Sequence, residues 1–350
     1  MKCIFSLSNL ILVIGLFLGS CQRDNIHTSG IIKEQFYLQN GDSKMQVYVE
    51  GNITPKKIVI TVHGGPGDGS LYLNVGEVNN IAEKQLAIAY WDQRLSGSSQ
   101  GNKQDKSLNS YVDDLKKLII LLKSRYGTDT KVYLLAHSWG GMIAPKFLEV
   151  PENQNMVEGW IQVDGAHNYP LNDSLSRWDL VNFGNQEIAA GRNKDQWTEI
   201  VNYCSQSDPK NDRKVAKKIN TYTHETDDLI AAVNPESPTT KERIKFLTKE
   251  YHYPLTTFLV NGIYNNIVGN VEDQAYQENI AARLNSITKP GLFLWGKYDF
   301  VCPTGLMNEI SSKISSTDVT TKIFQNSGHN PMFNEPVLFW TTVTGWVLAH

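Results

Sequence analysis

Residues 131–141 read Lys-Val-Tyr-Leu-Leu-Ala-His-Ser-Trp-Gly-Gly, and this short stretch decides the fold. The apolar run from Lys131 to Ala136 has the pattern of a strand that is buried on both faces of a sheet. The sequence from Gly140 to Val150 is helical in pattern. Ser138 therefore lies at a sharp turn between a strand and a helix, where a strained backbone needs small neighbours. This stretch alone leaves open an ordinary turn in which Ser138 only caps the helix.

Strands and helices alternate on both sides of this turn. The clearest helix runs from Ser107, which can cap it, to Tyr126, and Gly127 ends it. Near the start, two alternating apolar and polar runs flank Asn40-Gly41-Asp42, the signature of a β-hairpin. The other predicted strands are 33–38, 45–50, 57–62, 86–91, 158–163, 291–295 and 319–324, and the other predicted helices are 305–314 and 336–348. This order predicts an α/β fold with a mostly parallel central sheet and helices on both faces.

The stretch from about Ala166 to Leu284 has a different character. It is polar, rich in Asn, Asp, Lys and Trp, and helical in pattern, and it contains no convincing buried strand. We interpret it as a helical cap, residues 166–284, inserted into one core that comprises residues 31–165 and 285–350. The length of 350 residues alone favours about two domains. The strands on both sides of the insertion favour a single interrupted core instead.

The N-terminus has the pattern of a secretory signal. Lys2 precedes an apolar run from Leu10 to Leu18, which is short for a membrane span of ~20 residues. An uncleaved anchor helix is the alternative. The sequence Leu18-Gly19-Ser20-Cys21 resembles a bacterial lipobox. That resemblance implies a signal peptide over residues 1–20, lipidation of Cys21, a polar tether over 21–30, and a chain held at a membrane of the bacterial cell envelope by acyl groups.

Composition and charge exclude several classes of protein. Hydrophobic residues make up 41% of the chain and charged residues 20%, which is typical of a globular protein. The net charge of −3 provides no basic excess for a nucleic-acid partner. Cys3, Cys21, Cys204 and Cys302 have no CxxC spacing, so we expect no metal site and no disulfide scaffold. We predict that Cys204 and Cys302 are free buried thiols, with a disulfide between them as the alternative.

A glycine-rich motif, His63-Gly64-Gly65-Pro66-Gly67, directly follows an earlier predicted strand. Glycines let the backbone approach a ligand and present N–H groups, as an oxyanion hole requires. We expect the N–H of Trp139 to be one oxyanion donor and the N–H of Gly65 or Gly64 to be the other. The motif matches neither a P-loop nor a dinucleotide fingerprint. We expect His63 to fix the loop rather than to act as a base.

A histidine and an aspartate late in the chain complete a catalytic pattern. His329, in Ser327-Gly328-His329-Asn330, follows the last predicted strand, and Asp299 follows the strand before it. The order Ser138, Asp299, His329 is that of a serine nucleophile, its acid and its base in α/β-hydrolases. Asp164 also ends a predicted strand and is a rival for the acid. We favour Asp299 because the turn Gly296-Lys297-Tyr298-Asp299 occupies the usual position of the acid.

On these motifs the chain resembles the α/β-hydrolase superfamily and, within it, the prolyl-iminopeptidase-like serine peptidases. Trp91-Asp92-Gln93-Arg94 adds to the resemblance, which covers about residues 58–163 and 290–350. In that family Gly follows Asp-Gln-Arg, whereas this chain has Leu95. The resemblance implies an inserted helical cap, an aminopeptidase activity on short peptides, and acidic cap residues that hold the substrate amine. Asp92 and Arg94 are interpreted as structural residues that brace the oxyanion loop.

The cap gives weaker signals about specificity. Its glutamates show no clear counterpart of the tryptophan-and-glutamate pattern of the family, and we expect most of them on solvated helix faces. These glutamates are Glu187, Glu199, Glu225, Glu236, Glu242 and Glu250. Five cap aromatics are possible walls of an acyl pocket, although each one alone fits ordinary packing: Trp178, Trp197, Tyr203, Tyr251 and Tyr253.

The predicted chemistry is acyl transfer to water without a cofactor or metal. His329 takes the proton of Ser138, Ser138 attacks a carbonyl carbon, and Asp299 stabilises the imidazolium that forms. A small ester or amide hydrolase with the same triad is the main alternative, and a C–C hydrolase also fits the scaffold. A haloalkane dehalogenase or epoxide hydrolase does not fit, because those enzymes carry Asp in place of Ser138. A catalytically inactive, ligand-binding lipoprotein is the alternative from a different class.

Overall fold

The computed structural model describes residues 27–74, 77–101, 107–210, 212–226, 229–230, 245, 248 and 270–350. The predicted signal peptide, Cys21 and most of the tether lie outside the described residues, as do Glu236, Glu242, Glu250, Tyr251 and Tyr253 of the cap. Within the described residues, no helix is both long enough and apolar enough to cross a membrane.

In the described part of the chain, eight strands form one sheet in the order β1-β2-β4-β3-β5-β6-β7-β8. The strands are β1 (Ile31–Asn40), β2 (Ser43–Asn52), β3 (Lys57–Val62), β4 (Ala87–Trp91), β5 (Lys131–His137), β6 (Gly159–Val163), β7 (Gly291–Gly296) and β8 (Val319–Phe324). The first two strands pair antiparallel as the predicted hairpin, β2 also pairs antiparallel with β4, and the pairs from β4 to β8 are parallel. The sheet is therefore mixed and mostly parallel, and the predicted fold class is confirmed.

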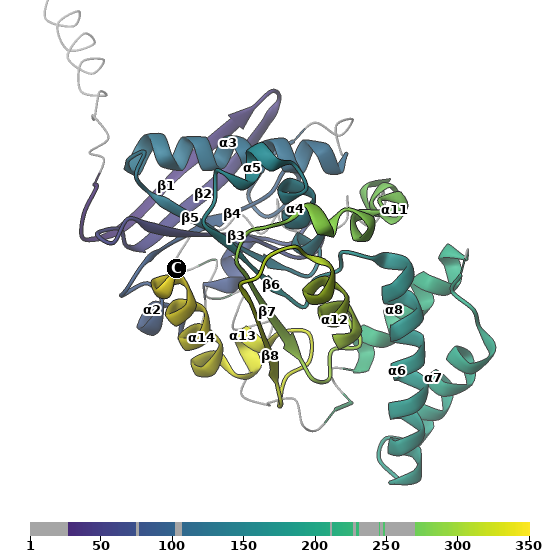
Figure 1. Cartoon of the computed structure of the whole chain (residues 1–350). Coiled ribbons are helices and arrows are strands. Elements are labelled where there is room, and N and C mark those ends of the chain that lie inside the picture. Colours follow the sequence, from purple (N-terminus) through teal and green to yellow (C-terminus); the bar gives the residue numbers. More distant parts are fainter. Residues whose placement is uncertain are drawn as a thin grey trace, which may run out of the picture.

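Helices cover both faces of the sheet (Figure 1). Apolar residues of α3 (Leu108–Tyr126), α4 (Gly140–Leu148), α11 (Asn270–Gln277) and α12 (Thr304–Lys313) pack on one face. Residues of η1 (Ser70–Leu73), α2 (Val78–Ile81), α13 (Pro331–Asn334) and α14 (Pro336–Ala349) pack on the other. The short elements α5 (Pro151–Gln154), η2 (Ile280–Ala282) and η3 (Leu284–Ser286) complete the described core.

The buried strands supply apolar side chains to both faces in strict alternation. In β5, Val132, Leu134 and Ala136 join the cluster under α3 and α4, whereas Tyr133 and Leu135 join the cluster under α14. The same alternation runs through β3 and β4. Since neighbouring side chains point to opposite faces of a strand, a continuous apolar run is what a sheet covered on both sides requires.

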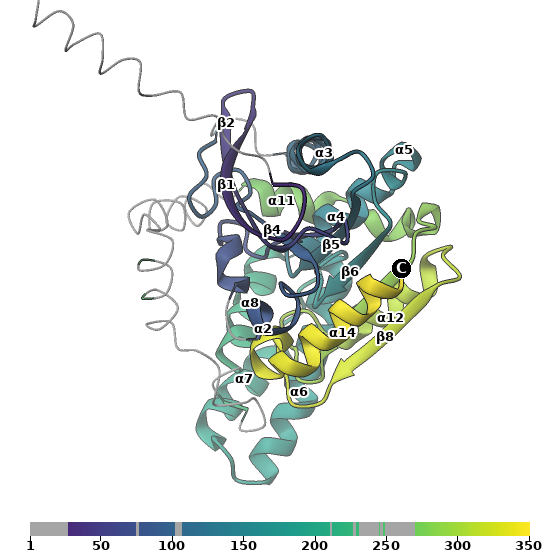
Figure 2. The same ribbon diagram turned by 90° about the vertical axis from the view of Figure 1, so that its left-hand side faces the viewer.

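In the described part of the stretch between β6 and β7, three helices extend beyond the sheet (Figures 1 and 2). They are α6 (Tyr169–Ala189), α7 (Lys194–Gln206) and α8 (Arg213–Thr226). They share a hydrophobic cluster of their own, in which Trp197 and Leu180 are fully buried and which reaches the core at Phe300. Farther along, Val271 of α11 packs into the main core cluster beside the sheet.

The predicted strand and helix boundaries agree with the structure to within two residues, and one of the two-residue differences has a clear reason. The helix predicted from Gly140 to Val150 ends at Leu148, and a separate turn of helix begins at Pro151. Proline disfavours the helical conformation in the residue before it, and Val150 is accordingly extended at φ −93° and ψ 116°. Cys204 and Cys302 are free and buried, which confirms that prediction.

Candidate active site

Ser138 lies at the carboxyl end of β5, between the strand and α4, with a backbone φ of +51°. Such a left-handed conformation is uncommon for a residue with a side chain and marks a strained turn. The turn also packs closely against its neighbours. A Cβ on Gly140 would lie 1.9 Å from the carbonyl oxygen of Val62, and one on Gly141 would lie 2.5 Å from the Cα of Gly165. The two glycines therefore allow the turn to sit on the edge of the sheet.

The structure brings Ser138, His329 and Asp299 into one hydrogen-bonded chain. The Ser138 hydroxyl lies 2.9 Å from Nε2 of His329, and Nδ1 of His329 lies 2.9 Å from Oδ2 of Asp299. The other carboxylate oxygen of Asp299 accepts hydrogen bonds of 2.9 Å from the backbone N–H groups of Val301 and Cys302. All three side chains follow strand ends at the same edge of the sheet, which explains how residues 191 positions apart come into contact.

Asp164, the rival acid, is buried in another role. Its backbone also has a positive φ, +46°, and its Oδ1 accepts a 2.9 Å hydrogen bond from the backbone N–H of Gly296. This bond ties the end of β6 to the end of β7, whereas the carboxylate bonded to His329 is that of Asp299. The geometry therefore favours Asp299 as the partner of the histidine.

The three predicted oxyanion donors are not equivalent in the structure. The N–H of Gly64 donates to the hydroxyl of Tyr72 at 3.3 Å. Among the described residues, neither the N–H of Gly65 nor that of Trp139 has a protein acceptor. Gly65 has a φ of +112°, a conformation open to glycine and costly for other residues. The geometry therefore favours Gly65 and Trp139 over Gly64 as the pair that faces a substrate oxygen.

Gln93 connects the glycine-rich loop to the serine turn. Its side-chain nitrogen donates to the backbone oxygen of His63 at 2.9 Å, and its side-chain oxygen accepts from the indole N–H of Trp139 at 3.1 Å. Its backbone N–H donates to Nε2 of His63 at 3.1 Å, so Nδ1 of His63 carries the proton and donates to the oxygen of Gly64 at 2.7 Å. His63 thus has both ring nitrogens engaged within the loop, in agreement with a loop-fixing role.

The two residues flanking Gln93 brace the loops in different ways. Asp92 accepts hydrogen bonds of 2.7 and 2.8 Å from the N–H and hydroxyl of Ser70, at the end of the glycine-rich loop. Arg94 instead forms a buried bidentate ion pair with Asp114 of α3, at 2.6 and 2.8 Å. The next residue, Leu95, has a φ of +57°, the conformation that a glycine at that place would adopt without strain.

Comparisons with known proteins show which families and folds this chain is similar to. The family described as serine aminopeptidase, S33, matches residues 53–186. A probable aminopeptidase, YbaC of Bacillus subtilis, is 22% identical over 91% of this chain and 97% of its own length. A proline iminopeptidase of Clostridioides difficile is 33% identical, over 27% of this chain and 30% of that protein. The crystal structure of a proline iminopeptidase from Mycobacterium smegmatis superimposes with a TM-score of 0.64 at 16% identity, covering 91% of this chain and 98% of that one.

The chain has the α/β-hydrolase fold. Residues 53–186 are similar to the S33 serine aminopeptidase family, and the chain is distantly similar to a probable aminopeptidase over most of its length. The structure of VinJ superimposes with a TM-score of 0.61 at 15% identity, covering 90% of this chain and 98% of that one. At this identity the likeness supports the fold alone.

His137, directly before Ser138, links the loop that carries His329 to the glycine-rich loop. Nε2 of His137 lies 2.9 Å from the backbone oxygen of His329, and its Nδ1 lies 2.8 Å from the hydroxyl of Tyr72. Because a carbonyl can only accept, Nε2 carries the proton and Nδ1 accepts from Tyr72, whose oxygen in turn accepts from Gly64. Burial, with the nearby His329, lowers the pKa of His137 to about 3. The ring therefore stays neutral at pH 7, and each hydrogen bond in this chain keeps the same donor and acceptor.

Sequence reasoning missed three titratable groups that surround the triad. Asp68 follows the glycine-rich motif, and burial raises the pKa of its carboxyl. Asp179 of α6 is partly buried, and burial together with the charge of Asp299 raises its pKa to about 6. The His224 ring of α8 lies 6.3 Å from the His329 ring, and burial lowers its pKa to about 4. Asp179 and His224 lie on helices of the predicted cap, where the sequence gives no sign of which helix face meets the core.

The described cap residues that the sequence did single out lie elsewhere. Glu187 is buried and paired with Arg192, and the exposed Glu199 accepts a 3.0 Å hydrogen bond from the hydroxyl of Tyr222. Trp197 is fully buried in the cluster of the cap helices, against which Tyr203 packs. The others are Glu225 and Trp178, both exposed. These contacts are those of packing and of solvated helix faces.

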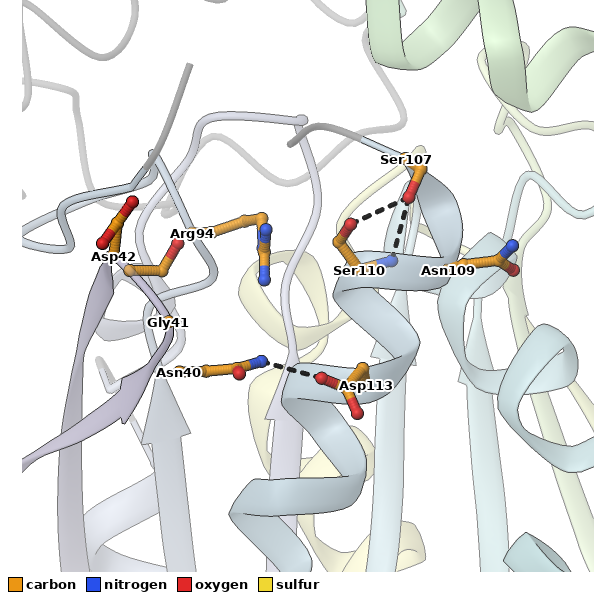
Figure 3. Close-up of a pocket in the computed structure, with 9 residues that line it drawn as sticks. Asn40, Gly41, Asp42, Arg94, Ser107, Asn109, Ser110 and Asp113 are labelled. Atoms are coloured by element: carbon orange, nitrogen blue, oxygen red, sulfur yellow. Dashed lines mark hydrogen bonds between the residues drawn. The ribbon is translucent and has the colours of Figure 1, made fainter. Parts of the chain in front are cut away.

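A separate polar cavity of about 420 Å³ contains none of the triad residues (Figure 3). It lies between the β1–β2 turn and the first turns of α3. Its wall includes the Asn40 amide, which donates to Asp113 at 2.9 Å, and the hydrogen-bonded pair Ser107 and Ser110. Arg94 also borders the cavity, but its guanidinium is committed to the buried pair with Asp114.

Proposed function

We propose that this hydrolase uses Ser138 as its nucleophile, His329 as its general base and Asp299 as the acid that orients the base. The observation that carries the proposal is the unbroken hydrogen-bonded chain from Asp299 through His329 to the Ser138 hydroxyl, with both bonds at 2.9 Å. A base within hydrogen-bond reach of the nucleophile, itself held by a third group, is the arrangement that nucleophilic catalysis requires.

The mechanism follows from the proton positions. Asp299 accepts from Nδ1–H of His329, so Nε2 is left with its lone pair toward the serine hydroxyl and takes the proton as Ser138 attacks a substrate carbonyl. The N–H groups of Gly65 and Trp139 stabilise the oxygen that becomes negatively charged. His329 then returns the proton to the leaving group, and a water molecule activated by the same histidine releases the acyl group from Ser138.

The substrate class we propose is a short peptide from which the N-terminal residue is removed. The names of two relatives support it, since YbaC is a probable aminopeptidase and the other is a proline iminopeptidase. The electrostatics around the triad also support it. Asp68 and Asp179 place carboxyl groups beside the triad, and a carboxylate in a partly desolvated setting binds an ammonium group well.

Loss of the nucleophile tests the catalytic proposal. Ser138→Ala should lower kcat by at least ~10⁴-fold, because the covalent step has no other nucleophile, while the circular dichroism spectrum stays that of the wild type. A fluorophosphonate probe should label the wild-type protein at Ser138 and leave the variant unlabelled. An unlabelled wild type would instead favour a ligand-binding protein on an inactive scaffold.

A substrate screen tests the proposed class. Aminoacyl-naphthylamides, with Pro and Ala at the amino terminus, are compared with p-nitrophenyl esters of short neutral acids. The proposal predicts higher kcat/KM on the naphthylamides. A clear preference for the esters would leave the serine mechanism in place and identify the chain as a small ester hydrolase.

We also propose that the chain is exported and anchored by acyl groups on Cys21. The support is the Leu18-Gly19-Ser20-Cys21 sequence after a short apolar run. Metabolic labelling with a palmitate analogue should mark the wild-type protein in the membrane fraction of the expressing bacterium. Cys21→Ala should lose the label and leave the membrane fraction, and a labelled Cys21→Ala variant would contradict the anchor.

A further inference from the structure

Asp68 places a carboxyl group directly beside the glycine-rich loop of the site. Its Oδ2 lies 3.5 Å from the point that a Cβ on Gly64 would occupy, and that same point lies 3.1 Å from Cβ of Ser138. Its carboxyl carbon lies 3.5 Å from the corresponding point on Gly65. The carboxyl group and the serine thus border one small space, which is open only because both loop residues lack a side chain.

The Asp68 carboxyl has no compensating partner among the described residues. No hydrogen bond or ion pair to its oxygens is present in that part of the chain, and solvent reaches the side chain. The surrounding protein still desolvates the carboxyl group, and this burial raises its pKa. The charges of the nearby His63 and His329 lower that pKa. Both histidines are already committed to other hydrogen bonds. His224, also close to His329, is neutral at pH 7 because burial lowers its pKa to about 4.

A carboxylate at this position opposes acyl transfer to a neutral substrate. The carbonyl oxygen gains negative charge as Ser138 attacks, and Gly65, whose N–H is a proposed donor to that oxygen, is the residue next to which the Asp68 carboxyl lies. Two like charges a few ångströms apart in a partly desolvated site repel strongly. A positive charge on the substrate near the reacting carbonyl removes this repulsion. An α-ammonium group is separated from the carbonyl carbon by a single carbon atom, so it reaches this region whenever the carbonyl does.

We propose that Asp68 is the specificity-determining residue that binds the α-ammonium group of the substrate, so that only an acyl group with a free amine reacts efficiently. This inference rests on the proposed function. It assigns recognition of the amine to the loop of the core that also supplies an oxyanion donor. Asp68 then binds the amine, and Gly65 of the same loop binds the oxyanion. The interaction with the amine therefore stabilises the transition state as well as the bound substrate. The cap carboxylate Asp179 lies beside Asp299 instead and provides the natural comparison.

The test compares a substrate that carries a free amine with its acetylated form and with a simple neutral ester. Alanine 4-nitroanilide, N-acetylalanine 4-nitroanilide and p-nitrophenyl acetate are hydrolysed by the wild type, Asp68→Asn, Asp68→Glu and Asp179→Asn. In Asp68→Asn we expect kcat/KM to fall roughly 10- to 100-fold for the free amine, the range of a hydrogen bond to a charged group. We expect it to rise for the two neutral substrates, because the repulsion is gone. Asp68→Glu should keep the preference for the free amine.

A pH profile separates this role from a structural one. The wild type should lose its preference for alanine 4-nitroanilide as the substrate amine deprotonates around pH ~8, whereas Asp68→Asn should show no such loss. The exposed Asp129, before the amino end of β5 and far from the site, supplies the matched control, and Asp129→Asn should behave as the wild type.

Three other outcomes would contradict the inference, and each would overturn a different part of it. If the wild type prefers the free amine and Asp68→Asn keeps that preference, the assignment to Asp68 is wrong while the proposed aminopeptidase function stands. A preference lost only in Asp179→Asn would move amine recognition to the cap. If the wild type treats the free and acetylated anilides alike, both the inference and the proposed substrate class are overturned.

Discussion

The His329 side chain illustrates how one residue is held in a single protonation pattern. Its Nδ1 faces a carboxylate and its Nε2 faces a hydroxyl, both at 2.9 Å. The carboxylate has its own orientation fixed, since the opposite oxygen of Asp299 accepts two backbone N–H groups. The ring therefore cannot exchange its two nitrogens without losing bonds at both ends, and the lone pair stays directed at Ser138.

Substitution of the acid should expose this dependence. In Asp299→Asn, the oxygen of the amide can still accept from Val301 and Cys302, so its NH₂ group faces Nδ1 of His329. The histidine must then carry its proton on Nε2, where it cannot act as a base toward Ser138. We expect kcat to fall on the order of 10⁴-fold while the thermal midpoint changes little. Steady-state kinetics and differential scanning fluorimetry measure the two effects.

Asp164→Asn is the matched comparison. The Asp164 carboxylate accepts from the Gly296 N–H, and an asparagine oxygen can do the same, so kcat should stay within about tenfold of the wild type. If instead Asp164→Asn lost as much activity as Asp299→Asn, the assignment of the acid from the structure would be wrong.

The sequence predicts the triad residues better than their surroundings, for a physical reason. Ser138, Asp299 and His329 each follow a strand, and the carboxyl ends of parallel strands meet at one edge of a sheet. Gln93 also follows a parallel strand, β4, but that position does not reveal its contacts, and Asp68 lies farther along a loop. Their partners are set by how loops fold over that edge, and no periodicity in the sequence encodes the contact.

At the scale of elements, the close packing of α4 against β3 is the feature most sensitive to change. Gly140 opens the helix, and a Cβ there would lie 1.9 Å from the backbone oxygen of Val62, which cannot move without breaking the sheet. We expect Gly140→Ala to destabilise the fold by about 4 kcal/mol or more and to abolish activity. Urea unfolding and the soluble yield measure this effect.

Gly345 in α14 offers the opposite case on another helix. It is exposed, and a Cβ would meet nothing within 4 Å. Because alanine is the better helix former, Gly345→Ala should stabilise the protein by about 0.5–1 kcal/mol without a change in kcat. If Gly140→Ala and Gly345→Ala changed the free energy of unfolding equally, the close contact between Gly140 and Val62 would not limit the side chain at position 140.

Local signals fix most element boundaries. Ser107 accepts from the N–H of Ser110, and Gly127 ends α3 with a φ of +119°, as the sequence predicts. The cap helices differ from one another. In α6 the polar side chains are spread over several faces, so the orientation of Asp179 depends on packing against the core. In α8 the apolar residues gather on one face, but that pattern does not show that His224 approaches His329. The resemblance predicts a cap, but it does not reveal which cap side chains reach the triad.

At the scale of the whole molecule, two apolar clusters on either side of one sheet imply a core that unfolds as a unit. The free energy of unfolding should depend on whether Glu83 is protonated. This residue is 8% exposed and accepts a 2.6 Å hydrogen bond from the hydroxyl of Tyr90. Burial raises its pKa from 4.5 to about 7. Between pH 4.5 and about pH 7 the folded state holds a proton that the unfolded state has released, so the free energy of unfolding falls as pH rises. Above about pH 7 the carboxylate is charged in both states, and the folded state bears the full cost of burying that charge.

Glu83→Gln should remove this cost, because the neutral amide keeps an oxygen for Tyr90 and has no charge to bury. We expect the variant to be more stable than the wild type by about 2 kcal/mol at pH 8 and nearly equal to it at pH 5, where the wild-type carboxyl is already protonated in the folded state. Urea titrations of the two proteins at both pH values measure the difference. The exposed Glu152, changed to Gln, should leave stability within about 0.5 kcal/mol at either pH. A gain for Glu83→Gln that is the same at pH 5 and pH 8 would mean that packing, and not the charge, determines the effect at this position.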